Sequence, residues 1–222
     1  MGSKMLTGSM MLGGMILGFI TTFFETSTSE TDSFAVAAQQ LIDSSMQSVL
    51  SGTVFTISIL ATLIGTAYLA RSMQGENRPG SDIAGLASVL AFLAAAILVV
   101  SSGLQMSLLD TSYTERGGDA AVAYAISEGI AHSSFSLIGA SILLLGIAIV
   151  RQKNLNLILG AFTGLFGLLL LIGGVIPAGD PGLDSTTAIE AVGGIIWFIG
   201  FIGWFVTTMV IGGFTIKQAR VT

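Results

Sequence analysis

The chain has no cysteine, a single histidine and few charged residues. Only 9% of its 222 residues are charged, whereas a soluble domain carries about 25%. The absence of cysteine excludes disulfides, thiol catalysis, iron–sulfur ligation and Cys-type zinc sites. One histidine cannot supply both axial ligands of a bis-histidine haem within a monomer, nor a three-His zinc or copper site. No basic patch suits nucleic acid, so nucleic-acid binding is not expected.

Charge is missing above all from long continuous stretches, while 52% of the residues are hydrophobic. About 20 apolar residues are enough to cross the hydrocarbon core of a bilayer as a helix, and lipid-exposed backbone must satisfy its hydrogen bonds within the segment. The sequence therefore predicts an all-α, polytopic membrane protein with one domain, 1–222, that forms a bundle of six transmembrane helices. The spans are expected at about 5–24, 46–70, 83–106, 130–150, 157–177 and 191–216.

The first apolar run resembles a secretory signal peptide, because Lys4 precedes it and Ala35-Val36-Ala37 mimics a cleavage site. That site lies well beyond the run, which ends at Phe24, and acidic residues intervene. The run is therefore expected to be the first span rather than a cleaved leader.

The lysines and arginines indicate the orientation of the bundle, since those in short loops set topology. Only Arg116 falls on one side of the predicted spans. The seven on the other side are Lys4, Arg71, Arg78, Arg151, Lys153, Lys217 and Arg220. Both termini are therefore predicted to be cytoplasmic. All acids except Glu76 and Asp82 fall on the opposite, outer side, in agreement with this orientation. The expected location is a cell membrane crossed several times, namely a prokaryotic plasma membrane.

The connections between spans carry local signals. Apolar residues recur at helical spacing after Phe34, which predicts a short helix at the outer surface that runs into the second span. Asn77-Arg78-Pro79-Gly80 is a turn signature. The connection 151–156 is so short that the fourth and fifth spans should be antiparallel neighbours.

Small residues in the spans predict close helix packing, because helices in lipid associate through backbone approach rather than through the hydrophobic effect. The glycines expected to serve this purpose are Gly14, Gly18, Gly160, Gly164, Gly193, Gly200 and Gly203. Ser58, Thr62 and Thr66 form a hydroxyl stripe that either bonds to helix carbonyls and packs on a neighbour or lines a polar path. Trp197 and Trp204 lie deep in the last span, where they fill grooves between helices or build a ligand pocket.

The candidate site residues are Asp43, Glu128, His132 and Glu190, an outer-face polar cluster. Asp43, Glu128 and Glu190 each precede a span that enters from the outer side. Glu128 and His132 are four residues apart and share a helix face, so the carboxylate could orient the imidazole in a proton relay or a metal second shell. The alternative is a pair that merely sits at the membrane interface.

Other catalytic patterns are absent from the sequence. No lysine lies within a span, which excludes a retinal Schiff base, and no P-loop motif occurs. No Asp, Glu or Arg lies mid-membrane, which argues against proton coupling or voltage sensing. Ser141 lies too far along the helix from His132 to pair with it. No catalytic residue, metal or cofactor is expected.

The overall plan resembles a family of uncharacterised six-span prokaryotic membrane proteins described only as a domain of unknown function. The resemblance rests on the outer amphipathic segment 34–46, the basic stop Arg151-Gln152-Lys153, the glycine-rich fifth span LGAFTGLFGLLLLIGGVIP, and Glu190 followed by Trp197. It covers nearly the whole chain and implies the six-span topology, and it brings no catalytic residues.

Two functions of different class follow from these patterns. The first is a non-enzymatic structural or accessory membrane component, whose partners are the lipid bilayer and other membrane proteins or further copies of itself. The second is a small-molecule permease or binding protein with a polar pocket in the outer leaflet. An enzyme is not expected.

Overall fold

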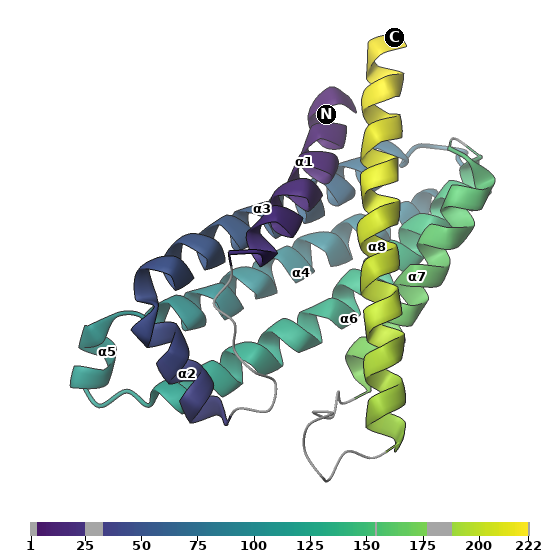
Figure 1. The fold of residues 1–222 in the computed structure, drawn as a ribbon. Coiled ribbons are helices and arrows are strands. Elements are labelled where there is room, and N and C mark those ends of the chain that lie inside the picture. Colours follow the sequence, from purple (N-terminus) through teal and green to yellow (C-terminus); the bar gives the residue numbers. More distant parts are fainter. Residues whose placement is uncertain (1–3, 25–32, 154, 177–187, 222) are drawn as a thin grey trace.

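The computed structural model describes residues 4–24, 33–153, 155–176 and 188–221, and within them all regular structure is helical (Figure 1). The predicted all-α fold is confirmed. The helices of this part are α1 (Lys4–Thr22), α2 (Phe34–Asp43), α3 (Ser45–Ser72), α4 (Ser81–Leu108), α5 (Thr111–Glu115), α6 (Ala120–Gln152), α7 (Leu157–Val175) and α8 (Ala188–Val221).

Six of these helices are long and apolar enough to cross a membrane, and they coincide with the six predicted spans. They are α1, α3, α4, α6, α7 and α8. The shortest, such as α1 with 19 residues, extend about 29 Å, which matches a hydrocarbon core of about 30 Å. The longest, α8 with 34 residues, extends about 51 Å and must therefore tilt or project from the core.

Helix α6 begins ten residues before the predicted span 130–150, so the helix is longer than the stretch expected to cross the membrane. A side-chain oxygen of Asp119 accepts a hydrogen bond of 3.1 Å from the backbone N–H of Val122 and caps the N-terminus of this helix. The expected separate helical turns at 120–126 and the span at 130–150 are thus one helix of 33 residues. Glu128 and His132 lie inside this helix rather than at its start.

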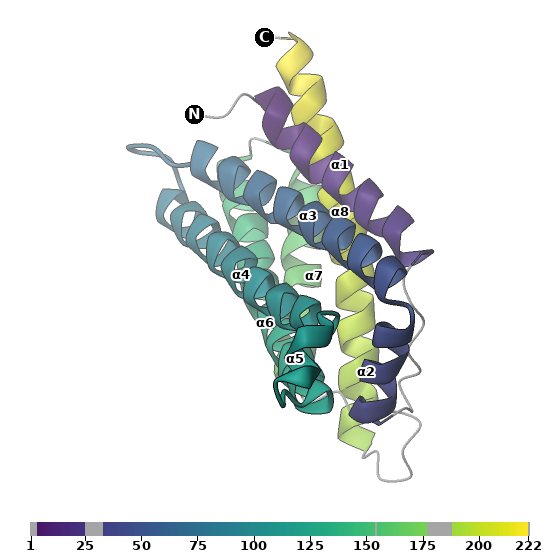
Figure 2. The same cartoon turned by 90° about the vertical axis from the view of Figure 1, so that its left-hand side faces the viewer.

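The six long helices form a closed ring in the order α1, α3, α4, α6, α7, α8 (Figures 1 and 2). Each span packs on the next one along the chain, and α8 returns to α1 to close the ring. The fourth and fifth spans, α6 and α7, were predicted to be antiparallel neighbours, and they pack against each other.

Both termini lie at the same end of the ring (Figure 1). We call this end the basic end, because the seven basic residues other than Arg116 lie on the helix ends and turns found there. The opposite end, where α2 and α5 lie, is called the acidic end, and it holds Asp43, Asp110, Glu115, Asp119 and Glu128. The charges are therefore segregated as predicted, while the assignment of the basic end to the cytoplasm stays a prediction.

The centre of the ring is filled by side chains. One apolar cluster contains residues of all six long helices, among them Met15, Leu63, Ile142, Leu170 and Trp204, each 0–1% exposed. The indole of Trp204 is the largest fully buried side chain of the described chain. The predicted groove-filling role of the deep tryptophan is confirmed at this position.

Glycines set the distance between α6 and α7. A methyl group on Gly146 would lie 2.6 Å from the Cα of Gly164, and one on Gly139 would lie 2.8 Å from the carbonyl oxygen of Gly167. No real Cβ tolerates such distances to backbone atoms, so these two helices touch backbone to backbone. Of the predicted glycines, Gly160 takes part in this contact, where a methyl group would lie 2.8 Å from Cγ2 of Ile149, and Gly200 packs on α7, where a methyl group would lie 2.5 Å from the backbone nitrogen of Leu170. The predicted Gly164 would accept a methyl group in ordinary contact, whereas Gly139 and Gly146 were not among the predicted glycines.

Helices α1 and α3 meet at the predicted hydroxyl stripe. Thr62 donates to the carbonyl of Ser58 at 3.0 Å, and Thr66 donates to that of Thr62 at 2.9 Å. Ser58, Thr62 and Thr66 are all 0% exposed, and Gly14 and Gly18 of α1 approach Ser58 and Thr62. The stripe therefore bonds to its own helix and packs on a neighbour, the first of its two predicted roles.

Hydroxyl groups also join α4 to its neighbours. Ser141 of α6 donates to the carbonyl of Ala87 at 2.8 Å, and Ser101 of α4 donates to that of Ser127 at 2.8 Å. Hydrogen bonds between helices contribute about 0.6 kcal/mol each on average in membrane proteins. They fix the register of α4 on α6 and so hold the acidic end of α6 in place.

The predicted outer helix and turn are both present. α2 is separated from α3 by one non-helical residue, Ser44, at φ −107° and ψ 34°, and Ala37 and Ala38 bury its inner face against Tyr124. The turn after α3 has Asn77 at φ 59° and Gly80 at φ 76°, left-handed values that favour these two residue types.

Candidate functional site

The acidic residues predicted to form the outer cluster have different surroundings. Asp43 is exposed at the end of α2, and its Oδ1 accepts a hydrogen bond of 2.8 Å from Nε2 of Gln39. α2 can present this carboxylate toward solvent because its other face, Ala37 and Ala38, is buried on α6. Glu190 lies in the first turn of α8, and its side chain is outside the described part of the structure.

Glu128 is the member of the cluster that lies among helices. Its Oε1 accepts a hydrogen bond of 2.9 Å from Nε2 of Gln105 on α4, and the residue is partly buried. One turn from this pair, the bond from Ser101 to the carbonyl of Ser127 clamps α4 to α6. The carboxylate therefore has a fixed, neutral donor instead of a basic counter-ion.

Gln105 was missed in the sequence-based site. A signal for it exists, because Ser101 and Gln105 are polar residues four apart in an otherwise apolar run and so share a helix face. The partner helix could not be identified from one sequence, since ring order is a property of the packed bundle.

His132 lies one turn from Glu128 on α6, as predicted. Its Nε2 is buried and has no hydrogen-bond partner among the described residues, while the Glu128 carboxylate accepts a hydrogen bond from Gln105. A buried nitrogen of this kind is costly unless water or a ligand satisfies it. Among all the described residues, His132 included, no three His, Asp or Glu side chains gather closely enough to hold a metal ion.

An aromatic cluster lies next to His132, toward the middle of helices α6 and α8. Phe135 of α6 packs edge-on against Trp197 of α8 with ring centroids 5.4 Å apart, and Trp197 stacks on Phe201 at 5.2 Å. Phe201 in turn meets Trp204 at 5.7 Å. The indole nitrogens of Trp197 and Trp204 are buried and, like His132 Nε2, have no partner in the described chain.

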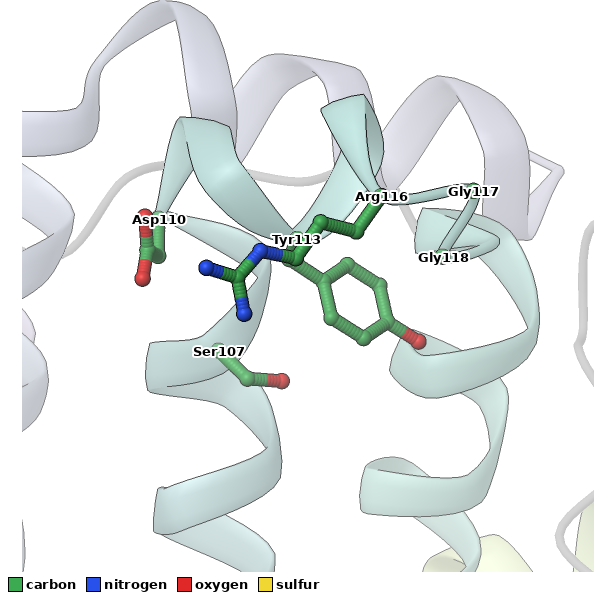
Figure 3. Close-up of a pocket in the computed structure, with 6 residues that line it drawn as sticks. All are labelled: Ser107, Asp110, Tyr113, Arg116, Gly117 and Gly118. Carbon is green, nitrogen blue, oxygen red and sulfur yellow. The ribbon is translucent and has the colours of Figure 1, made fainter.

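A surface hollow of about 440 Å³ lies at the α4–α5 turn of the acidic end (Figure 3). It is lined by Ser107, Asp110, Tyr113, Arg116, Gly117 and Gly118. Figure 3 shows the side chain of Arg116 extending across it toward Asp110 and Ser107. A guanidinium beside a carboxylate and a hydroxyl suits a polar solute that carries both an anionic and a donor group.

The loop geometry explains why this hollow is open. Gly117 has φ 87°, and the N–H of Gly118 bonds to the carbonyl of Tyr113 at 2.9 Å, which folds the chain back over the tyrosine ring. A methyl group on Gly118 would lie 2.5 Å from that ring. The sequence marked Arg116 as the one basic residue on its side, but not the fold-back that places it beside Asp110.

Comparisons with known proteins give a family and nothing more specific. The model of a family described as a domain of unknown function, DUF4386, matches residues 6–208. No curated protein and no solved structure matches the chain.

Proposed function

Because this chain belongs to the DUF4386 family, whose description assigns no activity, we propose a function from its geometry: a non-enzymatic structural or accessory component of the membrane. The chain is an integral membrane protein with six apolar helices. The proposal concerns what it does there.

The observation that carries the proposal is the filled centre of the ring. A carrier or channel needs a polar or water-lined path near the bilayer midplane. Here Met15, Leu63, Leu170 and Trp204, which lie near the middle of their helices, meet with 0–1% exposure. The deep hydroxyls of Ser58 and Thr62 are directed to backbone carbonyls of their own helix. These features support a packing role over a transport role.

The hydroxyl groups near the sole histidine also support a non-enzymatic role. A serine nucleophile needs a hydrogen bond to a general base. Ser134, two residues from His132, instead donates to the carbonyl of Ala131 at 2.6 Å, and Ser127 donates to that of Tyr124 at 2.8 Å. Within the described residues, no hydroxyl bonds to Nε2 of the imidazole.

A partner surface is supported by a glycine of α1 that the packing of this chain does not itself require. A methyl group on Gly13 of α1 would meet no atom within 4 Å, and Gly13 and Ser9 are both exposed one turn apart. Glycine in a helix costs about 1 kcal/mol relative to alanine in water. Small residues four apart on a lipid-facing helix are typical of contacts between membrane helices. We therefore place the contact with a partner protein or a second copy at this face of α1.

The test is purification in mild detergent from the native membrane, followed by mass spectrometry under non-denaturing conditions. The expected result is a stoichiometric second polypeptide or a homo-oligomer that is lost in Gly13→Leu. Gly103→Leu is the matched control, because a methyl group there also meets nothing within 4 Å. A monomer without partners in the wild type, or equal loss in both variants, would contradict the proposal.

A second candidate is binding or passage of a small polar solute at the acidic end. It is favoured by the unpartnered Nε2 of His132 beside the Glu128–Gln105 pair and by the hollow at Arg116. The expected result is solute binding that weakens when Asp43, Glu128, His132 and Glu190 are changed to alanine together. Unchanged binding and flux for every solute tested would remove this candidate.

A further inference from the structure

An apolar groove follows the seam of α6 and α7 on the outside of the ring and has a volume of about 350 Å³. Its floor is formed by residues with little or no side chain, Gly146, Gly160, Ala161 and Gly164. Leu143 and Leu168 wall its inner part, and Leu165 and Leu168, 48% and 39% exposed, place it on the surface that faces lipid. Its volume falls within the range of about 300–1,000 Å³ of small-molecule sites.

The hollow follows from the close approach of the two helices. A methyl group on Gly146 would overlap the backbone of Gly164. A methyl group on Gly164, in contrast, would lie 3.7 Å from the nearest atom, which is ordinary van der Waals contact. Helix packing therefore needs the glycine at 146 but not the one at 164. The space above Gly164 and Ala161 is left open to the membrane.

One cationic side chain, Arg151, lines the end of this groove at the basic end. Its stem rests on the α3–α4 turn, where a methyl group on Gly80 would lie 3.4 Å from Cβ and Cδ of Arg151. Among the described residues, the guanidinium group of Arg151 has no hydrogen-bond or ion-pair partner, and Lys153 follows in the C-cap of α6. The positive end of the α7 dipole begins close by at Leu157.

We propose that the α6–α7 groove binds an anionic phospholipid, with an acyl chain over Gly164 and Ala161 and the phosphate group at Arg151. Basic pockets between membrane helices at one face of the bilayer are typical sites for anionic head groups. The apolar floor and walls suit a hydrocarbon chain. A chain that lies in the groove makes more van der Waals contacts with the protein than a lipid chain that lies on a protruding part of its surface. This site is separate from the acidic end and from the α1 face, so it stands or fails independently of the function proposed above.

Charge argues against a second copy of the chain as the occupant. Two copies that pack in the same orientation across this groove would bring both Arg151 side chains to one level of the membrane. The basic end carries seven cations and, of the acids, only Glu76 and Asp82. The two Arg151 side chains would therefore repel across this groove, whereas an anionic lipid is complementary to them.

The test is native mass spectrometry of the detergent-purified protein, titrated with phosphatidylglycerol or with phosphatidylcholine of the same chains. The wild type is expected to retain one phosphatidylglycerol with preference over phosphatidylcholine. Arg151→Gln should weaken phosphatidylglycerol about fivefold, since one basic side chain near an anionic surface contributes a factor of about five. Ala161→Leu, which fills the exposed floor, should weaken both lipids.

Two control variants match these changes away from the groove. Arg71→Gln removes an exposed cation of the same end, and Ala96→Leu enlarges an exposed alanine of α4. Both are expected to bind like the wild type. Equal lipid retention in all variants would overturn the proposal. So would an Ala161→Cys variant that forms a disulfide with a second copy while its lipid retention is unchanged.

Discussion

Gln105 of α4 and Glu128 of α6 are joined by a hydrogen bond of 2.9 Å between helices, at the level where the acidic end meets the apolar core. Among the described residues, this amide is the one side-chain hydrogen-bond donor to the carboxylate. The pair therefore links the packing of α4 on α6 to the state of the one partly buried acid in the described chain.

We predict strong coupling between these two residues. Gln105→Leu should lower the free energy of unfolding by about 1–3 kcal/mol, because the partly buried carboxylate loses its donor. The double variant Gln105→Leu/Glu128→Leu should recover most of that loss, since replacing both partners with apolar groups is nearly neutral. A double-mutant cycle of unfolding in detergent measures this. Simply additive effects would show that the bond is not energetically significant.

Two glycines on one seam should respond in opposite ways to the same change. Gly146→Ala is expected to destabilise the fold by about 1–3 kcal/mol, because the new methyl group would overlap the backbone of Gly164. Gly164→Ala should be neutral or slightly stabilising, because its methyl group has room and alanine favours helix. Thermal unfolding of both variants in one detergent provides the comparison. Equal destabilisation would contradict the described α6–α7 contact.

The orientation of the bundle can be tested without removing any native thiol, because the chain has no cysteine. Ser45 begins α3 at the acidic end, Ser72 ends it at the basic end, and both are exposed. On intact cells, an impermeant maleimide should label Ser45→Cys, and it should label Ser72→Cys only after lysis. The opposite pattern would invert the predicted topology.

Most of the fold could be predicted from the sequence, because the length and apolarity of a span are properties of the segment itself. The distribution of Lys4, Arg71 and Arg151 on one side of the spans and Arg116 on the other likewise predicted which helix ends lie together. Helix α6 starts ten residues before the predicted span because the cap at Asp119 sets the start of the helix, whereas the thickness of the bilayer sets the length of a span.

The sites were harder to predict, because they depend on contacts between helices. The sequence marked Glu128 and His132, but its spacing suggested an interaction within α6, while the described bond crosses to Gln105 of α4. The hollow at Arg116 requires the fold-back at Gly117, and the groove at Arg151 requires the approach of Gly146 to Gly164. None of these contacts can be predicted from the periodicity of hydrophobic residues in the sequence.

The contact of α1 with α8 has a consequence for how the protein is made. The other five contacts of the ring join spans that follow one another, so each can form as soon as the ribosome delivers the later helix. Gly8 of α1 has to wait for Gly212 of α8, and a methyl group on Gly8 would lie 2.7 Å from the carbonyl oxygen of Gly212. Until the last span arrives, this edge of α1 faces lipid. An unfinished or truncated copy thus differs from a mature one by an uncovered glycine edge on α1.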